Sequence, residues 1–405
     1  MSEVQHIDGT GGSRPTILFV IGSMDIGGAE RHLAQLLPRL VQRGFGVHLF
    51  TLTGRGELAE EVERAGVSVH SPDGVGARVP SSFLGRALRL LASASRFRSV
   101  IRKADPLIVH AFLAEGYLFA RTLTLFDRRM VFIMSRRSLN NYQSKRPVLA
   151  WYERWLHGSL DLASGNSRAI LEQLVSERIP RSKLRLIYNG VAISRSSSML
   201  HDGRRDRAAS DDRVIIVCVA NILPYKRHDL LIRALKRMSV AIPPDRWRCL
   251  LVGRIGVHGE LVRGLVRGLG LDGSIDFLGS VRDVMPILHT ADIGILISAE
   301  EGFSNSVLEK MAASLPVVVT DVGGNAEAVV DGVTGVVVAP DDEAGIAEAL
   351  ARLILDRGLR ERLGEAAHAR VSETFSIEST CEGYIDLYRS ALERLRARGA
   401  RGRDC

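Results

Sequence analysis

Residues 292–321 read DIGILISAEEGFSNSVLEKMAASLPVVVTD, and this stretch decides the fold. Two short apolar runs in it, DIGILIS and PVVVTD, are rich in Ile and Val, which is typical of buried strands. A glycine-led polar turn and the helix-forming run SVLEKMAAS separate them, with Ser304 or Asn305 as the expected N-cap. A strand, a helix and a second strand in this order predict two parallel strands joined by a crossover helix.

The same alternation fills the rest of the chain in two blocks. The first block opens with the strand TILFVIGSM at 16–24, followed by a helix that ends near Gly44, and the second opens with VIIVCVAN at 214–221. Between the blocks, residues 192–213 are polar and serine-rich without an apolar period, which indicates a linker. We therefore predict an α/β protein with two doubly wound, Rossmann-like domains that face a central cleft.

These patterns also set the expected boundaries. We predict a disordered tail (1–14), an N-terminal domain (15–191), the linker (192–213), a C-terminal domain (214–375), and a C-terminal helix that packs back toward the N-terminal domain and ends in a basic tail (376–405). Ligands are expected at the carboxyl ends of the strands, where parallel sheets bind them.

Composition narrows the class of protein. The 405 residues include 54 Lys and Arg against 46 Asp and Glu, a net charge of +8 that favours anionic partners such as nucleotides, phosphates or acidic lipids. No zinc-finger or RNA-binding aromatic signature accompanies this charge, which argues against nucleic acid. The four cysteines are widely spaced without a CxxC pair, which suits a reducing compartment. The polar N-terminus and the lack of a long apolar run predict a cytoplasmic protein.

A glycine pair follows the first strand, in the turn GSMDIGGAE. Gly27 and Gly28 can bring the backbone close to a ligand, and the helix N-terminus that follows suits a phosphate or a sugar hydroxyl. The alternative is a tight turn that needs glycine only for its backbone angles. The turn lacks the order GxGxxG, which counts against a dinucleotide-dependent oxidoreductase.

Two cations stand at the corresponding turn of the second block, in PYKRHDLLI. Lys226 and Arg227 lie just before a helix, where charge-assisted hydrogen bonds would neutralise a diphosphate. The alternative interpretation is solvated loop charge.

Two glutamates flank the turn in the opening stretch. Glu301 precedes the turn and Glu309 lies within the first two helical turns, so both can face one pocket. The backbone of Phe303, Ser304 and Asn305 would direct N–H groups into the same pocket. Carboxylates that accept paired hydroxyls beside a helix N-terminus suit a polyhydroxylated anionic ligand. Ordinary capping and surface charge is the alternative.

These motifs resemble the family-4 (group 1) glycosyltransferases, which have the two-domain GT-B fold. The resemblance runs from about Thr16 to residue 375, and it rests on GGAE, IVHAFL, NSRAI, YNGV, PYKRHDLLI, FLGSVRDVMPILHTADI, EGFSNSVLEKMA and VGGNAEAVVDGVTGVVV. It implies a retaining transfer of a sugar from a UDP- or GDP-sugar to an acceptor hydroxyl. No cofactor is implied, and without a D-x-D motif no metal requirement is expected. The N-terminal domain would bind the acceptor and the C-terminal domain the nucleotide sugar.

The resemblance also implies roles for single residues. Glu309 would hold the donor ribose, Glu301 the donor sugar, and the backbone at Phe303–Asn305 the sugar and diphosphate. Lys226 would neutralise the leaving diphosphate. Three further contacts are implied at the base and the phosphates, from Val281, Arg282 and the Gly27–Gly28 pair.

The sequence departs from the family pattern in three places. Relatives often carry Arg at the position of Asn221, so that one phosphate cation is either missing here or supplied by Arg227. Ala192 follows YNGV where Asp is usual. Arg136 lies where many relatives place a cleft histidine, and it could replace the histidine's contact to the donor or mark a subgroup with a different acceptor. His110, at the end of an earlier strand, is either a catalytic candidate or structural.

The stretch 84–103 predicts a basic amphipathic helix. Its apolar stripe would comprise Leu84, Leu88, Leu91 and Val100, and its cations are Arg86, Arg89, Arg96, Arg98, Arg102 and Lys103. Such a helix suits an anionic membrane surface and therefore a glycan or lipid-linked acceptor. A solvated helix packed on its own domain is the alternative.

Two other classes of function remain open. A nucleotide-sugar epimerase shares the two-domain architecture, and fold alone does not exclude it. A non-catalytic nucleotide-sugar binding partner is the other, because of the altered region around Arg136.

Overall fold

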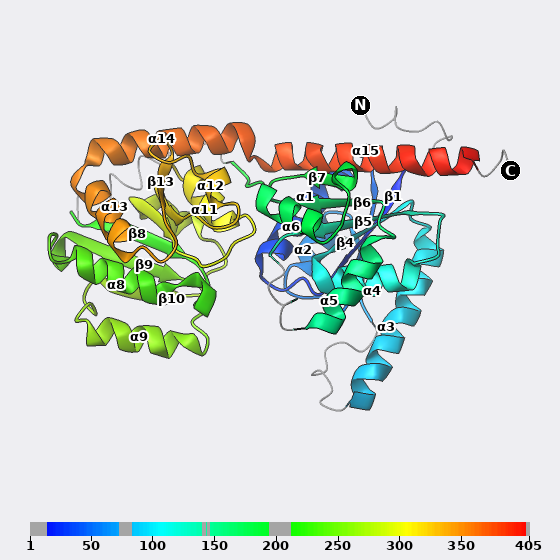
Figure 1. The fold of residues 1–405 in the computed structure, drawn as a ribbon, viewed down its shortest axis with the longest axis horizontal. Coiled ribbons are helices and arrows are strands. Elements are labelled where there is room, and N and C mark those ends of the chain that lie inside the picture. The colour runs from blue at the N-terminus through cyan, green and yellow to red at the C-terminus, as the bar shows by residue number, and fades with distance from the viewer. Residues whose placement is uncertain (1–13, 73–82, 140–142, 144–145, 194–211, 402–405) are drawn as a thin grey trace. The chain divides into compact units, whose positions relative to one another are not determined.

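The structure is a computed structural model that describes residues 14–72, 83–139, 143, 146–193 and 212–401. It divides the chain into two compact units (Figure 1). Unit 1 takes the residues up to Tyr188 together with those from Ile377 onward, and unit 2 runs from Asn189 to Ser376. Most of the expected linker at 192–213 lies outside the described residues.

Unit 1 is built on a parallel sheet with the strand order β3-β2-β1-β4-β5-β6-β7. Its strands are β1 (Thr16–Ile21), β2 (Gly46–Thr51), β3 (Ser68–His70), β4 (Ile108–Phe112), β5 (Val131–Arg136), β6 (Leu162–Gly165) and β7 (Leu184–Leu186). Its helices are α1 (Gly28–Gln42), α2 (Ala59–Arg64), α3 (Phe83–Ala104), α4 (Leu113–Thr124), α5 (Pro147–His157), α6 (Arg168–Ser176), the short η3 (Arg181–Lys183) and α15 (Ile377–Arg401).

Helices cover both faces of this sheet because its strands are apolar on both sides. In β1, Ile17 and Phe19 belong to one buried cluster, while Leu18 and Val20 belong to another on the opposite face. The first cluster packs under α1 and α15, and the second packs under α3, α4, α5 and α6. Each residue position along a strand therefore decides which helical layer its side chain meets.

Helix α15 completes unit 1, although it follows unit 2 in the sequence. Cys381, Tyr384 and Tyr388 on this helix are buried in the same cluster as the β1 residues Ile17 and Phe19. The helix also contacts α1, β4 and β5.

Unit 2 repeats the plan with the strand order β10-β9-β8-β11-β12-β13. Its strands are β8 (Val214–Val219), β9 (Trp247–Val252), β10 (Ile275–Gly279), β11 (Ile293–Leu296), β12 (Val317–Thr320) and β13 (Gly335–Val338). Its helices are η4 (Pro224–Lys226), α8 (His228–Met238), η5 (Pro244–Arg246), α9 (His258–Gly268), α10 (Met285–Thr290), α11 (Asn305–Ala312), α12 (Asn325–Ala328), α13 (Glu343–Leu355) and α14 (Arg357–Thr374).

The predicted α/β architecture of two parallel-sheet domains is confirmed. In the stretch 292–321, β11, α11 and β12 occur in the predicted order, and β11 pairs with β12 in parallel register. The sequence did not indicate β6 or β7, because these strands are short and lack a run of β-branched residues. In both sheets the direction of strand addition reverses beside the first strand, which is where such folds bind ligands.

Candidate active site

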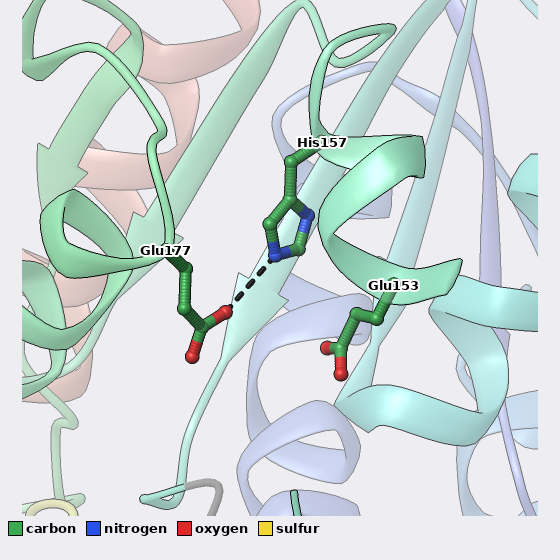
Figure 2. Close-up of side chains that lie close together, drawn as sticks. All are labelled: Glu153, His157 and Glu177. Carbon is green, nitrogen blue, oxygen red and sulfur yellow. Dashed lines mark hydrogen bonds and ion pairs between the residues drawn. The ribbon is translucent and has the colours of Figure 1, made fainter. Parts of the chain in front are cut away.

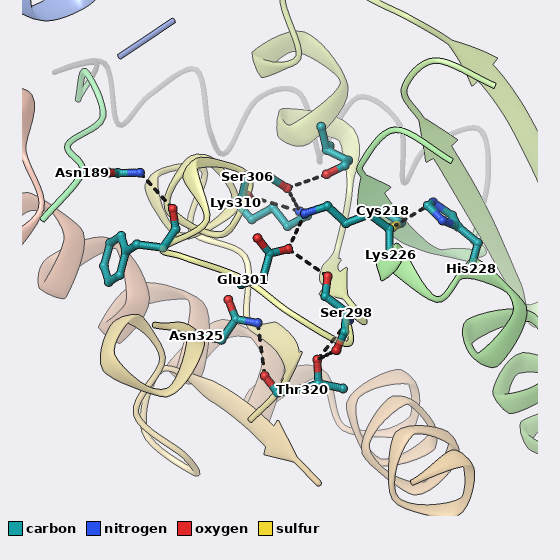
Figure 3. Close-up of polar contacts among 12 residues, drawn as sticks. Asn189, Cys218, Lys226, His228, Ser298, Glu301, Ser306, Lys310, Thr320 and Asn325 are labelled. Carbon is teal, nitrogen blue, oxygen red and sulfur yellow. Dashed lines mark hydrogen bonds and ion pairs between the residues drawn. The ribbon is translucent and has the colours of Figure 1, made fainter. Parts of the chain in front are cut away.

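The predicted site of unit 2 lies where two neighbouring strands end. Lys226 follows β8 and Glu301 follows β11, and these strands pair in parallel. The two loops are joined directly, because the backbone N–H of Ala299 donates to the carbonyl oxygen of Tyr225 at 2.7 Å. The Lys226 ammonium forms an ion pair with Glu301 Oε1, and the two side chains keep 16% and 10% exposure (Figure 3). The structure therefore brings together two residues that the sequence places 75 positions apart.

A set of bonds from β12 and the loop after it holds Glu301 in place (Figure 3). The Ser298 hydroxyl donates to Glu301 Oε1 at 2.8 Å, and the Thr320 hydroxyl bonds both the N–H and the carbonyl of Ser298. Asn325 in turn donates to the Thr320 carbonyl at 3.1 Å. Gly323 has φ +55°, and a Cβ there would lie 1.8 Å from the Glu301 carbonyl oxygen, so only glycine fits. No local sequence pattern marks these supporting residues.

The turn before α11 is held by the first residue of unit 2. The Asn189 amide donates to the Phe303 carbonyl at 2.8 Å and to Asn305 Oδ1 at 2.5 Å. The Phe303 ring is buried and packs against Phe375. Ser304 is the N-cap residue as predicted, but its side chain accepts no capping bond. The signal for Asn189 was the YNGV run, to which we assigned no role.

A buried lysine supports α11 from beneath. Lys310 is fully buried, and its ammonium donates to the carbonyl and the hydroxyl of Ser306, which itself donates to the Val219 carbonyl at 2.7 Å. The lysine stem passes Gly294, where a Cβ would lie 2.5 Å from Lys310 Cδ. Burial lowers the pKa of the Lys310 ammonium from 10.5 to about 8. Glu309, the preceding residue, is half-buried on the same helix.

The neighbouring cation is already neutralised. Arg227 adopts left-handed backbone angles with φ 41° and forms ion pairs with Asp229 and Asp341. Asn221 accepts a 2.9 Å bond from the backbone N–H of Arg254, so its amide oxygen organises the loop after β9. The suggestion that Arg227 replaces a missing phosphate cation is therefore disfavoured, because two carboxylates share its charge.

The loop after β10 carries the predicted contacts to the base. Val281 is half-buried and packs on the cluster that contains Val284, whereas Arg282 is exposed.

The pattern GxGxxG occurs once in this unit, at 268–273, where it ends α9 and precedes β10. A dinucleotide-binding loop has the opposite order, a strand followed by a helix, so this match carries no phosphate site.

In unit 1 the glycine pair lies at the start of α1. Gly27 is the residue before the helix and is extended with φ −152°, a conformation open to any residue. A Cβ on Gly27 would lie 2.2 Å from Glu30 Oε2, the end of a side chain that can move aside, so neither space nor backbone angles make glycine necessary here. Gly28 is the first residue of α1. Burial raises the pKa of the Glu30 carboxyl.

Arg136 lies at the end of β5 inside an ionic network. It donates to Glu177 Oε1 at 2.5 Å and to Glu153 Oε1 at 2.7 Å. Gln143 donates to the other oxygen of Glu153 at 2.9 Å, and His157 lies 3.0 Å from the other oxygen of Glu177. The side chain of Arg136 is only 5% exposed. Its guanidinium therefore holds α5 and the end of α6 to the sheet, and these contacts disfavour the expected contact of Arg136 with the donor.

The three acids and bases of this network have the composition of a metal site. Glu153, His157 and Glu177 offer ligand atoms within 4.8 Å of one another (Figure 2). However, each carboxylate oxygen already accepts a hydrogen bond or lies within bonding distance of His157, and the guanidinium of Arg136 supplies the compensating positive charge. The network therefore fits a structural role without a metal.

His110 is a core residue. Its Nδ1 lies 2.9 Å from the Tyr388 hydroxyl and its Nε2 lies 2.7 Å from the Ser135 hydroxyl, and the ring is fully buried. Burial, reinforced by the nearby charge of Arg137, places the pKa of His110 well below its ordinary value. Of the two interpretations left open for His110, these contacts favour the structural one over a catalytic role.

The predicted amphipathic stripe of α3 is wrong at Val100. This residue is buried with Phe97 in the core of unit 1, whereas Leu88 and Leu91 are 58% and 66% exposed. The side chains of Leu84, Arg86 and Arg89 lie outside the described part of the structure. Within the described chain, no helix has the length and apolar character needed to cross a membrane.

Known structures with this architecture define the class of fold. Anabaena HepE in complex with UDP-glucose matches 93% of this chain and 99% of its own, with a TM-score of 0.78 at 20% identity. At that identity the likeness shows the fold alone, which is the two-domain GT-B fold.

Two family models then match the two halves. The model for Glycosyltransferase Family 4 matches residues 26–195, and the model for Glycosyl transferases group 1 matches residues 213–356. The chain belongs to this family of glycosyltransferases.

Named relatives differ in how much of their length is matched. D-inositol 3-phosphate glycosyltransferase of Kribbella flavida is 34% identical to this chain. The match covers 48% of this chain and about half (47%) of the length of that protein. The lipopolysaccharide core biosynthesis glycosyltransferase LpsE of Rhizobium meliloti is 25% identical over 90% of this chain and 96% of its own.

Proposed function

We propose that this protein transfers a sugar, with retention of its anomeric configuration, from a nucleotide diphosphate sugar to an acceptor hydroxyl. The observation that carries the proposal is the ion pair of Lys226 and Glu301 at the ends of β8 and β11. This pair lies at the switch point of a doubly wound sheet, and the helix that carries Glu309 begins beside it.

Lys226 and Glu301 would bind different parts of the donor. Lys226 would leave Glu301 for the diphosphate, because a charge-assisted bond to an anion replaces the one it loses. Glu301 would then accept hydroxyls of the donor sugar while Ser298 keeps it oriented. Negative charge grows on the leaving diphosphate during the reaction, and prepositioned cations and N–H groups stabilise it.

Glu309 and the start of α11 would bind the rest of the donor. Glu309 would accept the ribose hydroxyls, and the backbone of Phe303–Asn305 would meet the sugar and diphosphate. The bonds from Asn189 fix this turn in advance, so little order would have to be gained on binding. The cationic groups would also make a metal unnecessary, and we expect none to be required.

The acceptor would belong to envelope or extracellular glycan synthesis, on the cytoplasmic side. The name of LpsE, a lipopolysaccharide core biosynthesis enzyme, supports this choice, whereas other relatives are named for an inositol phosphate acceptor. UDP is the first donor to test, because HepE was solved with UDP-glucose.

Thermal stability against UDP-, GDP- and ADP-linked sugars tests the donor. A ligand at a hundred times its Kd adds about 2.7 kcal/mol to the free energy of unfolding, which raises the midpoint. We expect the nucleotide sugars of one base to raise the midpoint of unfolding, and we expect Glu309→Ala to abolish this shift. Glu260→Ala, which removes an acid 74% exposed on α9, is the matched control and should keep the shift. No shift with any nucleotide sugar would contradict the proposal.

Product analysis separates transfer from the other two classes. Isomerised UDP-sugar without an acceptor would identify an epimerase, and binding without transfer to any acceptor, including water, would identify a binding partner. An inverted anomeric centre in the product, read by NMR, would contradict retention.

A further inference from the structure

Unit 1 contains a cavity that the proposed donor site does not use. It is a cavity of about 520 Å³ between α3, α4 and α5, within the range of small-molecule sites. Its walls are almost entirely apolar, and they include Leu90, Ala94, Leu118, Phe119, Leu123 and Leu149. A water-filled cavity of this kind is unfavourable, so an apolar occupant would gain free energy by displacing the water.

One end of the cavity is polar and lies at the ligand-binding edge of the sheet. Thr53 and Glu115 line this end, and the Thr53 hydroxyl donates to the carbonyl of Gly22 directly after β1. Glu115 is exposed at the start of α4, and it also approaches Gly22, where a Cβ would lie 3.3 Å from Oε2. The cavity therefore joins a hydroxyl and a carboxylate at the strand ends to an apolar interior. An amphiphile has the same arrangement.

The outer face of α5 beside the cavity is apolar, aromatic and cationic. Val148, Trp151 and Trp155 are 79%, 68% and 53% exposed, and Arg154 is exposed between them. The only acid of this helix, Glu153, is buried against Arg136. Exposed Trp with Arg and no acid matches the headgroup region of an anionic membrane.

We propose that this cavity binds the hydrocarbon chain of a membrane lipid that carries the acceptor, with the acceptor headgroup at Glu115 and Thr53. The identity of this lipid as acceptor rests on the proposed function, whereas chain binding does not. The exposed tryptophans of α5, together with Arg154, favour a membrane lipid over a soluble apolar molecule. The site would place the acceptor hydroxyl at the strand ends of unit 1.

Tryptophan fluorescence can report the occupant. Tyr152 lines the cavity, bonds the Thr122 hydroxyl at 2.8 Å, and stacks on Trp155 with ring centroids 5.8 Å apart. In Trp151→Phe, the tryptophans that remain are Trp155 and Trp247, and the latter is fully buried in unit 2 and serves as an internal reference. The probe is dodecyl maltoside with a brominated chain, below its micelle concentration.

We expect saturable quenching of Trp155. Ala94→Phe fills the cavity from α3 and should weaken the apparent affinity by about tenfold or more, because a filled cavity excludes the chain. Ala92→Phe adds the same ring to an exposed position of the same helix and should leave the affinity unchanged. Vesicles of phosphatidylglycerol with brominated chains should quench as well, and phosphatidylcholine vesicles much less.

Three results would overturn the inference: unsaturable quenching, an equal effect of Ala94→Phe and Ala92→Phe, or equal quenching by both vesicles. A cavity filled by another part of the chain would give no quenching and would count against it too. The nucleotide-sugar shift of unit 2 is measured separately. A retained shift with no chain binding rejects this inference alone, and chain binding with no shift rejects the proposed function alone.

Discussion

Each unit contains an ionic centre at a strand end, and the two centres differ in how much water reaches them. In unit 1, Arg136, Glu153 and Glu177 are 5%, 0% and 3% exposed, and all carboxylate oxygens have partners. In unit 2, Lys226 and Glu301 keep 16% and 10% exposure. A fully bonded buried network can be broken only at a large cost, whereas a partly exposed pair can exchange partners with a ligand. The first is suited to hold helices and the second to bind a substrate.

The largest effect should come from breaking the buried centre. Arg136→Met leaves two buried carboxylates without their cation, which should lower the free energy of unfolding by about 3–5 kcal/mol. Chemical denaturation of the purified variant measures this. Arg181→Met is the matched control, because Arg181 pairs with Glu172 on the surface, where the side chains are 68% and 60% exposed. That control should cost less than about 1 kcal/mol, and equal losses would reject the distinction.

Mutation of the partly exposed pair in unit 2 should change the rate of the reaction and not the stability of the fold. Lys226→Ala should lower kcat by about 10²–10³, because one preorganised cation is lost where charge develops. Its midpoint of unfolding should change little. Arg227→Ala provides the comparison: its charge is shared with Asp229 and Asp341, so the loss in kcat should be much smaller. A similar loss in both variants would place Arg227 on the diphosphate.

A third experiment tests how firmly Glu301 is held. Gly323→Ala puts a Cβ against the Glu301 carbonyl at a positive φ, and we expect a loss of about 2–3 kcal/mol together with weaker donor binding. Gly332→Ala has a similar φ of +69° but meets no atom within 4 Å, so it reports backbone strain alone. The difference between the variants in denaturation and in donor affinity measures the contact. No difference would show that the contact relaxes easily.

The smallest effect concerns the buried ammonium beneath α11. Because the folded pKa of Lys310 is lowered to about 8, the unfolded chain binds more protons between about pH 8 and 10.5, and stability should rise with pH there. Lys310→Met keeps the stem beside Gly294 and removes the charge. It should raise stability at pH 7 by about 1–2 kcal/mol and flatten this pH dependence. Denaturation at pH 7 and pH 9.5 tests both, and an unchanged slope would assign the dependence to other groups.

Sequence patterns sufficed for most of the fold because the strands are apolar on both faces and the helices are amphipathic. The stretch 292–321 shows this: two β-branched runs flank a helix, and the structure has the same elements in the same order. The strands β6 and β7 were not predicted, because LASG and LRL are too short to show a periodic pattern of apolar residues.

The site was predictable only in part. The spacing of Glu301 and Glu309 and the position of Lys226 follow from strand ends, which a sequence marks. The supports of Glu301, Ser298 and Thr320, are common polar residues whose pairing depends on the adjacent strand β12. Their partner is set by tertiary structure, which no local pattern reports.

Strand alternation alone disfavours a donor contact for Arg136 and a catalytic role for His110. Arg136 shares a face with Phe132 and Met134, which pack under α5 and α6, so its side chain had to meet that layer. His110 similarly shares a face with Ile108, beneath α15. Position at the end of a strand indicates a site only when the side chain does not turn into a helical layer.

The placement of α15 has a consequence for how the protein is made. Tyr384 and Tyr388 fill the core of unit 1, and they bond Arg137 and His110, whose positions in the chain precede theirs by 247 and 278 residues. A ribosome makes these tyrosines after all of unit 2. Unit 2 can thus fold during synthesis, whereas the core of unit 1 stays incomplete until α15 has been made. A premature stop before Ile377 would leave the apolar face that α15 covers exposed to aggregation and to proteases.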